Sequence, residues 1–307
     1  MAAQGIETGH EDMVHDAQLD YYGKRLATAS SDTTVKVFDM VGEAKGQPAV
    51  LNGHSAPVWA VAWAHPMFGS MLASCSYDKK VLVWKEETAG SWVVVYEFSE
   101  AAGSVNTIAW APHEFGLVLA AGSSDGSLSI ISKTEATDWT VTVVKDAHRV
   151  GVNSVSWAPA LPEGALTSAG KADDGSAALC QRLVSGGCDN MVRIWRYSTQ
   201  ESRWLQDAEL AHHTEWVRSV AWAPNVGLPT STIASAGQDG EVVVWSRGSE
   251  PHWSKTVIAQ LTETPWSVSF SLTGNILAVA GADGAVTLWK EDLDGEWRQV
   301  STLTDEA

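Results

Sequence analysis

The sequence has little positive charge. Lys and Arg together number 20 against 37 Asp and Glu, and the formal net charge of the 307 residues is −17 at pH 7. Nucleic-acid binding depends on clustered Lys and Arg side chains that neutralise phosphates, and so does adsorption to an anionic membrane surface. We therefore expect no direct contact with nucleic acid, and contact with a membrane only indirectly, through other proteins.

Cysteine and long apolar runs are also scarce. Cys75, Cys180 and Cys188 are an odd number and form no C-x-x-C pair, which favours reduced thiols over a disulfide framework or a zinc site. No apolar run approaches the roughly 18 residues of a membrane helix, and the opening residues MAAQGIETGHEDM lack the basic and apolar segments of a secretory signal. The chain is therefore expected to be soluble, and cytosolic or nuclear.

Nucleotide-binding signatures are missing too. Neither a phosphate-binding Walker loop nor a dinucleotide glycine fingerprint occurs. We expect no cofactor and no enzymatic activity.

Tryptophan, by contrast, is abundant, with 16 residues, and much of it recurs at a fixed spacing. Six times an Asp is followed six residues later by a large apolar residue, as in SYDKKVLVW. The six pairs are Asp32 and Phe38, Asp78 and Trp84, Asp125 and Ile131, Asp189 and Trp195, Asp239 and Trp245, and Asp283 and Trp289. Successive Asp residues lie 44 to 64 positions apart, so the spacing is a structural repeat.

Each repeat contains the pattern of four short strands. An apolar run ending in Trp or Phe, such as VWAVAWAHP, precedes a run of small residues such as LASCS, and in five repeats a last run opens with Trp, as in WVVVYEF. Such short, alternating runs bounded by Gly, Asp, Ser and Pro predict strands, and four strands in about 45 residues are typical of a β-propeller blade. We predict an all-β chain forming one six-bladed WD-repeat propeller, with blades at residues 14–52, 58–98, 105–146, 152–210, 217–261 and 265–303.

The fourth repeat carries an insertion at residues 160–178. This segment is rich in Gly, Ala, Pro and Ser, which predicts a disordered surface loop. Its DDG triplet could suggest a calcium loop, but the rest of the ligand pattern is missing.

Three histidines occupy the same position in their repeats, nine residues before the Trp of the first strand. With a Ser of the second strand, the turn Asp and the Trp of the third strand, each would form a buried hydrogen-bonded relay. The three sets are His54, Ser74, Asp78 and Trp84; His148, Ser185, Asp189 and Trp195; and His213, Ser235, Asp239 and Trp245. Ser, His and Asp could also be read as a hydrolase triad, but recurrence in three repeats favours a structural role.

The strand count leaves the propeller unlatched. The first blade begins with its inner strand and the last blade supplies all four of its own strands, so no strand remains to join the two. The exposed faces of these blades are then either a partner site or, alternatively, close face to face without strand exchange. The residues expected to line the seam are Met13, Val14, His15, Ala17 and Leu19 in the first blade, and Ile276, Leu277, Val279, Val286 and Leu288 in the last.

A second candidate surface is the rim of the central channel, four residues before each first-strand aromatic. Its residues are Trp59, Asn106, Asn153, Arg218 and Trp266. This mixed ring carries one cation, so neither a phosphate reader nor an acidic-peptide reader is favoured, although a free-standing peptide-reading adaptor stays an alternative function. His212 in HHTE has no second ligand at a workable spacing, so no metal site is expected there.

Beyond these patterns, the sequence closely resembles the Sec-thirteen family of WD-repeat proteins, from about His10 to Trp297. The resemblance is carried by HEDMVHDAQLDYYGKRLATASSD, GHSAPVWAVAWAHPMFGSMLASCSYDKKVLVWKEE, SVNTIAWAPHEFGLVLAAGSSDGSLSI, LVSGGCDNMVRIW, EWVRSVAWAPNVGLPTSTIASAGQDGEVVVW and NILAVAGADGAVTLWKEDLDGEW. It implies an open propeller completed in trans by a partner blade that slots between blades one and six.

The resemblance also implies partners and a location. The partners would be the α-solenoid scaffold protein of the COPII outer coat, which the propeller rigidifies, and a related nucleoporin of the Y-shaped nuclear pore complex. The chain would then lie in the cytoplasm, on the COPII vesicle coat at the cytosolic face of the endoplasmic reticulum, and at the nuclear pore. A sister open-propeller nucleoporin and a subunit of a nutrient-signalling complex that regulates TORC1 are the alternatives within this class.

Overall fold

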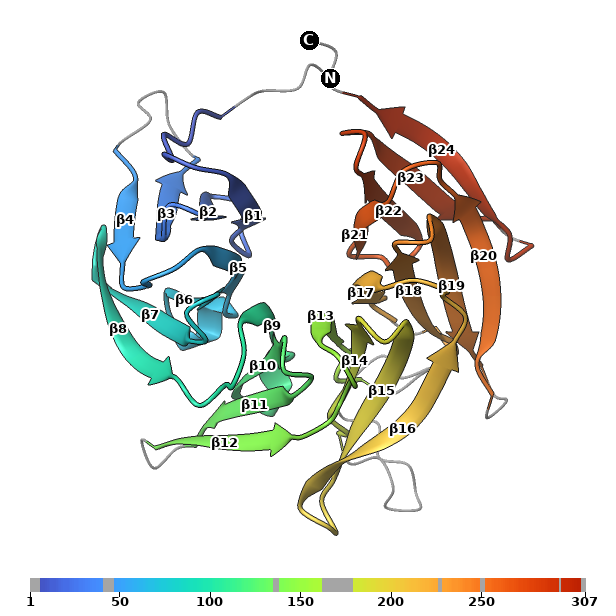
Figure 1. The fold of residues 1–307 in the computed structure, drawn as a ribbon, viewed down its shortest axis with the longest axis horizontal. Helices are drawn as coiled ribbons and strands as arrows, with labels where there is room; N and C mark the ends of the chain where they lie inside the picture. The colour runs from blue at the N-terminus through green and yellow to red at the C-terminus, as the bar shows by residue number, and fades with distance from the viewer. Residues whose placement is uncertain are drawn as a thin grey trace. The chain divides into compact units, whose positions relative to one another are not determined.

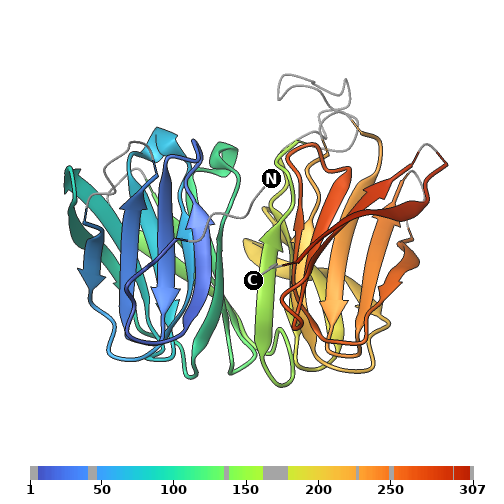
Figure 2. The ribbon, with the colours of Figure 1, turned by 90° about the horizontal axis from the view of Figure 1, so that it is seen from above.

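The computed structural model describes residues 6–40, 47–134, 138–161, 179–225, 228–248, 252–292 and 294–304. The chain divides into two compact units, Met1–Ala147 and His148–Ala307, each of which contains three four-stranded antiparallel sheets. Figure 1 shows the sheets of the first unit in blue to green and those of the second in yellow-green to red. Figure 2 shows the strands of the first sheet, in blue, running side by side.

The first unit holds sheets one to three. Sheet one consists of β1 (Val14–Leu19), β2 (Arg25–Ser30), β3 (Thr34–Asp39) and β4 (Ala49–Asn52). Sheet two consists of β5 (Val58–Trp63), β6 (Met71–Ser76), β7 (Val81–Thr88) and β8 (Ser91–Phe98). Sheet three consists of β9 (Val105–Trp110), β10 (Leu117–Ser123), β11 (Leu128–Lys133) and β12 (Trp139–Val144). Single 3-10 turns at Pro66–Phe68 and His113–Phe115 join the first two strands of sheets two and three.

The second unit holds sheets four to six. Sheet four consists of β13 (Val152–Trp157), β14 (Arg182–Gly187), β15 (Met191–Ser198) and β16 (Arg203–Ala211). Sheet five consists of β17 (Val217–Trp222), β18 (Ser231–Gly237), β19 (Glu241–Arg247) and β20 (Ser254–Gln260). Sheet six consists of β21 (Pro265–Phe270), β22 (Ile276–Gly281), β23 (Val286–Glu291) and β24 (Trp297–Leu303).

The repeated Asp forms the turn between the second and third strands of every sheet. In all six sheets one carboxylate oxygen accepts the backbone N–H two residues later, at 2.8 to 3.4 Å. The residue between them has a positive φ, as at Lys79 (69°) and Asn190 (65°), and in three sheets it is Gly, which adopts this conformation without strain. The Asp period in the sequence is therefore the period of this hairpin turn.

The core lies between successive sheets of each unit. In sheet two, Leu72, Leu82 and Trp84 pack with Ala27 and Val35 of sheet one, and the opposite face, with Ala73, Cys75, Val81 and Val83, packs with sheet three. Sheets four and five share one such core cluster, and sheets five and six share another. Alternate residues of the inner strands therefore serve opposite faces, as the strand period requires.

The six four-stranded antiparallel sheets confirm the predicted all-β, six-bladed fold, and no strand pairing among the described residues closes it. Sheet one is built from β1 to β4 alone and sheet six from β21 to β24 alone, so among the described residues neither takes a strand from the other end of the chain. The predicted insertion at residues 160–178 lies, from residue 162 onward, outside the described residues. No helix of the described segments has the length and apolarity to cross a bilayer.

Candidate functional site

The relay of sheet two brings together the four residues that the sequence singled out. His54 lies with Nε2 2.8 Å from Ser74 Oγ and Nδ1 2.9 Å from Asp78 Oδ2, and Trp84 donates its indole N–H to Ser74 Oγ at 2.9 Å. When Nδ1 donates to Asp78, Nε2 accepts the Ser74 hydroxyl, so every polar group of the set is satisfied. The relay ties the entry loop, the second strand and the third strand of one sheet together.

Sheets four and five contain the same arrangement. The Ser, His, Asp and Trp contacts recur there at 2.7 to 3.2 Å, in the sets His148, Ser185, Asp189 and Trp195, and His213, Ser235, Asp239 and Trp245. The three serines have no exposed surface, and each accepts an indole N–H on its oxygen. A substrate carbonyl cannot reach these hydroxyls, so the geometry supports strand tethering rather than nucleophilic attack.

The Asp residues of the three relays carry a negative charge. Burial alone would raise the pKa of Asp78, but hydrogen bonds from His54 and from the Ser55 and Lys80 backbone lower it to about 2. Burial would likewise raise the pKa of Asp189, but hydrogen bonds from His148, Arg193 and the Arg149 backbone hold it well below its usual range. Burial lowers the pKa of His213 in spite of the Asp239 charge. The carboxylates are therefore ionised hydrogen-bond acceptors at neutral pH.

Sheet one contains a fourth relay that the sequence reasoning missed. His10 lies with Nδ1 2.7 Å from Asp32 Oδ2 and Nε2 2.8 Å from Thr28 Oγ1, while Phe38 supplies no indole N–H. The sequence does contain a signal for this relay. It is the number of residues between the His and the start of the first strand, rather than between the His and the Trp of that strand. His10 precedes β1 by four residues, the offset at which His54, His148 and His213 precede β5, β13 and β17.

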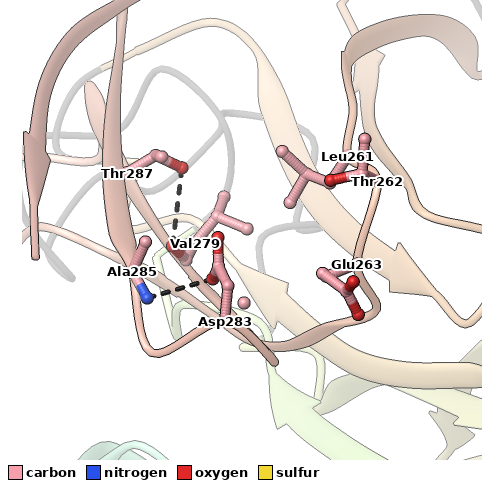
Figure 3. Close-up of a pocket in the computed structure, with 8 residues that line it drawn as sticks. Leu261, Thr262, Glu263, Val279, Asp283, Ala285 and Thr287 are labelled. Carbon is pink, nitrogen blue, oxygen red and sulfur yellow. Dashed lines mark hydrogen bonds between the residues drawn. The ribbon is translucent and has the colours of Figure 1, made fainter.

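Sheets three and six lack the relay. At the His and Ser positions sheet three has Ala101 and Ala121, and sheet six has Leu261 and Val279. In sheet six a hollow of about 50 Å³ remains at this place, lined by Leu261, Thr262, Glu263, Val279, Gly281, Asp283, Ala285 and Thr287 (Figure 3). There the Trp289 indole N–H donates instead to Thr287 Oγ1, at 3.0 Å.

The predicted seam residues of the last blade fall on two different faces. Leu277 and Val279 are buried in the core that sheet six shares with sheet five, so the prediction that they line a partner seam is wrong. Alternation along β22 turns them toward sheet five and turns Ile276 away from it. Val286 and Leu288 pair across the strands with Ala280 and Ala278 and share that other face, where all five residues are only half-buried.

We call this other face, formed by Ile276, Ala278, Ala280, Val286 and Leu288, the outer face of sheet six. The equivalent face of sheet five, with Ala234, Ala236, Val242 and Val244, is fully buried because sheet six covers it. The outer face of sheet six has the same apolar character but keeps exposed surface.

The predicted seam residues of the first blade are mostly exposed. Met13, Val14, Ala17 and Leu19 are exposed to solvent. His15, unlike these four residues, contacts neighbouring side chains. It lies 2.6 Å from Ser31 Oγ through Nε2, and its ring meets that of Trp59 at 4.5 Å, which turns it toward sheet two.

The outer face of sheet one mixes polar and apolar residues. It contains Thr28 and Lys36 together with Leu26 and Phe38, and the segment before β1 partly covers it. Lys36 Nζ donates to the Gly9 carbonyl at 2.5 Å, beside the contact of His10 with Thr28.

The predicted rim residues contact their neighbours. Trp59 Nε1 donates to Ser104 Oγ at 3.0 Å, and Ser104 Oγ in turn donates to Asn106 Oδ1. Asn153 Nδ2 donates to the Val217 carbonyl at 2.9 Å. In the second unit, Arg218 lies against the ring of Trp266.

His212 contacts one acidic and one basic side chain. Its Nε2 lies within ion-pair distance of Glu241, at 2.7 Å, and Lys255 Nζ lies 3.0 Å from its Nδ1. Across the described part of the chain, no three His, Cys, Asp or Glu side chains are grouped so that they could hold a metal ion.

Comparison with known proteins places this architecture in a class. The family described as WD domain, G-beta repeat matches residues 4–39, 46–85, 139–196, 205–246 and 255–290, which is more than half of the chain. The match skips most of the third blade, where Ala101, Ala121 and Ile131 replace the His, Ser and Trp of the repeat. The fold and its relays thus define a WD-repeat propeller protein.

Individual relatives identify the family within this class of WD-repeat proteins. The chain is 58% identical to the Protein transport protein SEC13 homolog A of Arabidopsis thaliana, over 84% of each chain. It is 54% identical to the Protein SEC13 homolog of Dictyostelium discoideum, over 83% of each, and 54% identical to the Protein transport protein sec13 of Schizosaccharomyces pombe, over 83% of this chain and 84% of the relative. The chain belongs to the Sec-thirteen (SEC13) family of WD-repeat proteins.

Proposed function

We propose that this chain is a structural subunit of the protein-transport machinery, in the outer coat of COPII vesicles between endoplasmic reticulum and Golgi. Relatives that cover most of its length are named protein transport proteins. In this proposal it binds an α-solenoid scaffold protein that donates a further blade. The observation that carries the proposal is the outer face of sheet six, because the equivalent face of sheet five is buried by a following sheet.

The donated blade would act as the missing following sheet. Its apolar side chains would cover Ile276, Val286 and Leu288, and burial of apolar area would provide most of the binding free energy. A propeller fixed to a helical solenoid in this way stiffens the solenoid. The proposal places the chain at the cytosolic face of the endoplasmic reticulum, held there by the coat rather than by its own contact with lipid.

The proposal extends to the nuclear pore. A nucleoporin of the Y-shaped complex with a solenoid of the same kind would use the same face, and so would the solenoid of a nutrient-signalling complex. The identity of the solenoid protein that co-purifies distinguishes these assemblies from one another, and distinguishes this chain from a sister open-propeller nucleoporin.

Co-expression with a solenoid fragment that carries three extra strands tests the proposal. We expect the fragment to co-purify with the chain and to raise its melting temperature. Val286→Asp and Leu288→Glu place a carboxylate on the outer face of sheet six and should abolish co-purification, because burying an unpaired charge is costly. Leu272→Glu, in the exposed turn between β21 and β22, is the matched control and should leave binding intact. Identical melting curves with and without the fragment would refute the proposal.

A further inference from the structure

Two exposed tryptophans flank an arginine in the second unit. The guanidinium carbon of Arg218, on β17, lies 5.0 Å from the ring centroid of Trp216 and 4.7 Å from that of Trp266, on β21. Both distances are within the range of cation–π contacts. Trp216 is nevertheless 42% exposed and Trp266 52% exposed, so each indole still offers a large apolar surface to solvent.

Among the described residues, no carboxylate pairs with the charge of Arg218. Its Nη2 donates to the neutral Gln238 Oε1 at 2.5 Å, its buried Nε has no hydrogen-bond partner, and none of the described carboxylates lies within ion-pair distance. Arg193, by contrast, contacts both Asp189 at 2.6 Å and Glu209 at 3.0 Å.

An unpaired arginine is notable in a chain of net charge −17 with 37 acidic residues. Glu215, three residues before Arg218, and Glu263, three residues before Trp266, are exposed and form no ion pair with Arg218. The guanidinium therefore keeps N–H donors for an external acceptor.

We propose that Trp216, Arg218 and Trp266 form a binding site for an extended peptide segment that carries a carboxylate next to an apolar side chain. The carboxylate of an Asp or Glu would accept N–H groups of Arg218 and supply its missing counter-charge. The apolar neighbour would lie on an indole, the kind of side chain that anchors peptide contacts. A single guanidinium suits a monoanion, whereas phosphate readers use clusters of arginines. This site is separate from the outer face of sheet six, which the proposed function uses.

Selection from a random heptapeptide library displayed on phage, with the full chain as bait, tests this site. We expect enriched peptides to contain Asp or Glu beside Leu, Ile, Phe or Trp. For a synthetic copy of an enriched peptide, Arg218→Gln and Trp266→Ala should each raise Kd by about tenfold or more. Replacing the peptide's acidic residue with its amide should do the same, and Arg218→Lys should recover part of the affinity.

The controls separate the site from the fold and from the proposed partner. Arg298→Gln removes an exposed arginine that pairs with Asp292 and Glu296, and it should leave Kd unchanged. Arg218→Gln should keep the melting temperature and the co-purification of the solenoid fragment. The proposal is overturned if no peptide is enriched, if enriched peptides lack acidic residues, or if binding survives Arg218→Gln. Tighter binding of a phosphoserine version than of the glutamate version would overturn the carboxylate assignment.

Discussion

His10 and Asp32 join the segment before the first strand to the first hairpin turn, with Nδ1 of the imidazole 2.7 Å from Oδ2 of the carboxylate. The other ring nitrogen contacts Thr28, a buried residue of β2. The segment that precedes β1 is therefore part of the first blade and partly covers the outer face of sheet one.

Removing this contact should destabilise the chain. We expect His10→Ala to lower the free energy of unfolding by about 1–2 kcal/mol, because Thr28 and Asp32 each lose a hydrogen-bond partner. Urea unfolding followed by tryptophan fluorescence measures the change. Glu7→Ala, at an exposed position of the same segment, should have no effect. Equal stability of the two variants would show that His10 does not hold the segment to the sheet.

The hydrogen bonds of the relay in sheet two should stabilise the folded chain. Ser74→Ala leaves the buried nitrogens of His54 and Trp84 without their shared partner, and we expect a loss of about 2 kcal/mol. Ser91→Ala, at the exposed start of β8, is the control. A Ser74→Ala variant that keeps full stability but loses a hydrolytic activity would instead revive the triad interpretation.

We expect acid to destabilise the fold because the Asp residues of the relays have lowered pKa values. The pKa of Asp78 is lowered to about 2 because the hydrogen bonds from His54, Ser55 and Lys80 outweigh the effect of burial. Its stabilising contribution is therefore complete above the unfolded pKa of about 3.9 and is lost as the pH falls toward about 2. Urea midpoints measured at about pH 5, 4 and 3 should decrease, and they should decrease less steeply for Asp78→Asn. Asp39→Asn, at an exposed position, should keep the wild-type slope; the same slope for Asp78→Asn would contradict the prediction.

The hollow in sheet six offers a constructive test of the relay. Leu261 and Val279 stand at the His and Ser positions, close to Asp283 (Figure 3). We expect Leu261→His and Val279→Ser to be destabilising singly but to couple favourably by about 1–2 kcal/mol when combined, because each supplies the other's hydrogen-bond partner. A double-mutant cycle of unfolding free energies measures the coupling. Additive effects would mean that the site cannot form the relay.

The two faces of sheet six should respond differently to truncation. Leu277→Ala removes a fully buried side chain and should cost about 2–5 kcal/mol in the isolated chain. Leu288→Ala, on the half-buried outer face, should cost about 1 kcal/mol or less. Thermal unfolding of both variants compares the two costs. A loss for Leu288→Ala as large as that for Leu277→Ala would mean that the outer face of sheet six is already covered.

Much of the fold could be predicted because its signals are local. The Asp that precedes each third strand accepts a backbone N–H two residues later, so its period is visible in contiguous residues. The relays at His54, His148 and His213 could be predicted because each repeats at a fixed offset. The first blade has Phe38 in place of Trp and no Trp in its first strand, so the equivalent His10 was missed.

Local sequence patterns could not assign the seam residues of the last blade to the correct face. Alternation along β22 separates its residues into two sets, but it does not say which set meets the preceding sheet, and Leu277 and Val279 were therefore assigned to the wrong face. Packing against sheet five decides the matter, since it buries Leu277 and Val279 in a shared core, and the register with β23 then puts Val286 and Leu288 with Ala280 and Ala278 on the other face.

The sequence by itself determined the four-stranded repeat, its hairpin turns and the acidic character of the chain, because each depends on residues close together along the chain or on composition. Only the tertiary structure decided which apolar residues of sheet six pack against sheet five, and that Arg218 lies between Trp216 and Trp266 with no ion pair to a described carboxylate. Trp266 follows Arg218 by a whole repeat. The packing of β17 beside β21 brings the two side chains together, and no pattern within one repeat encodes that contact.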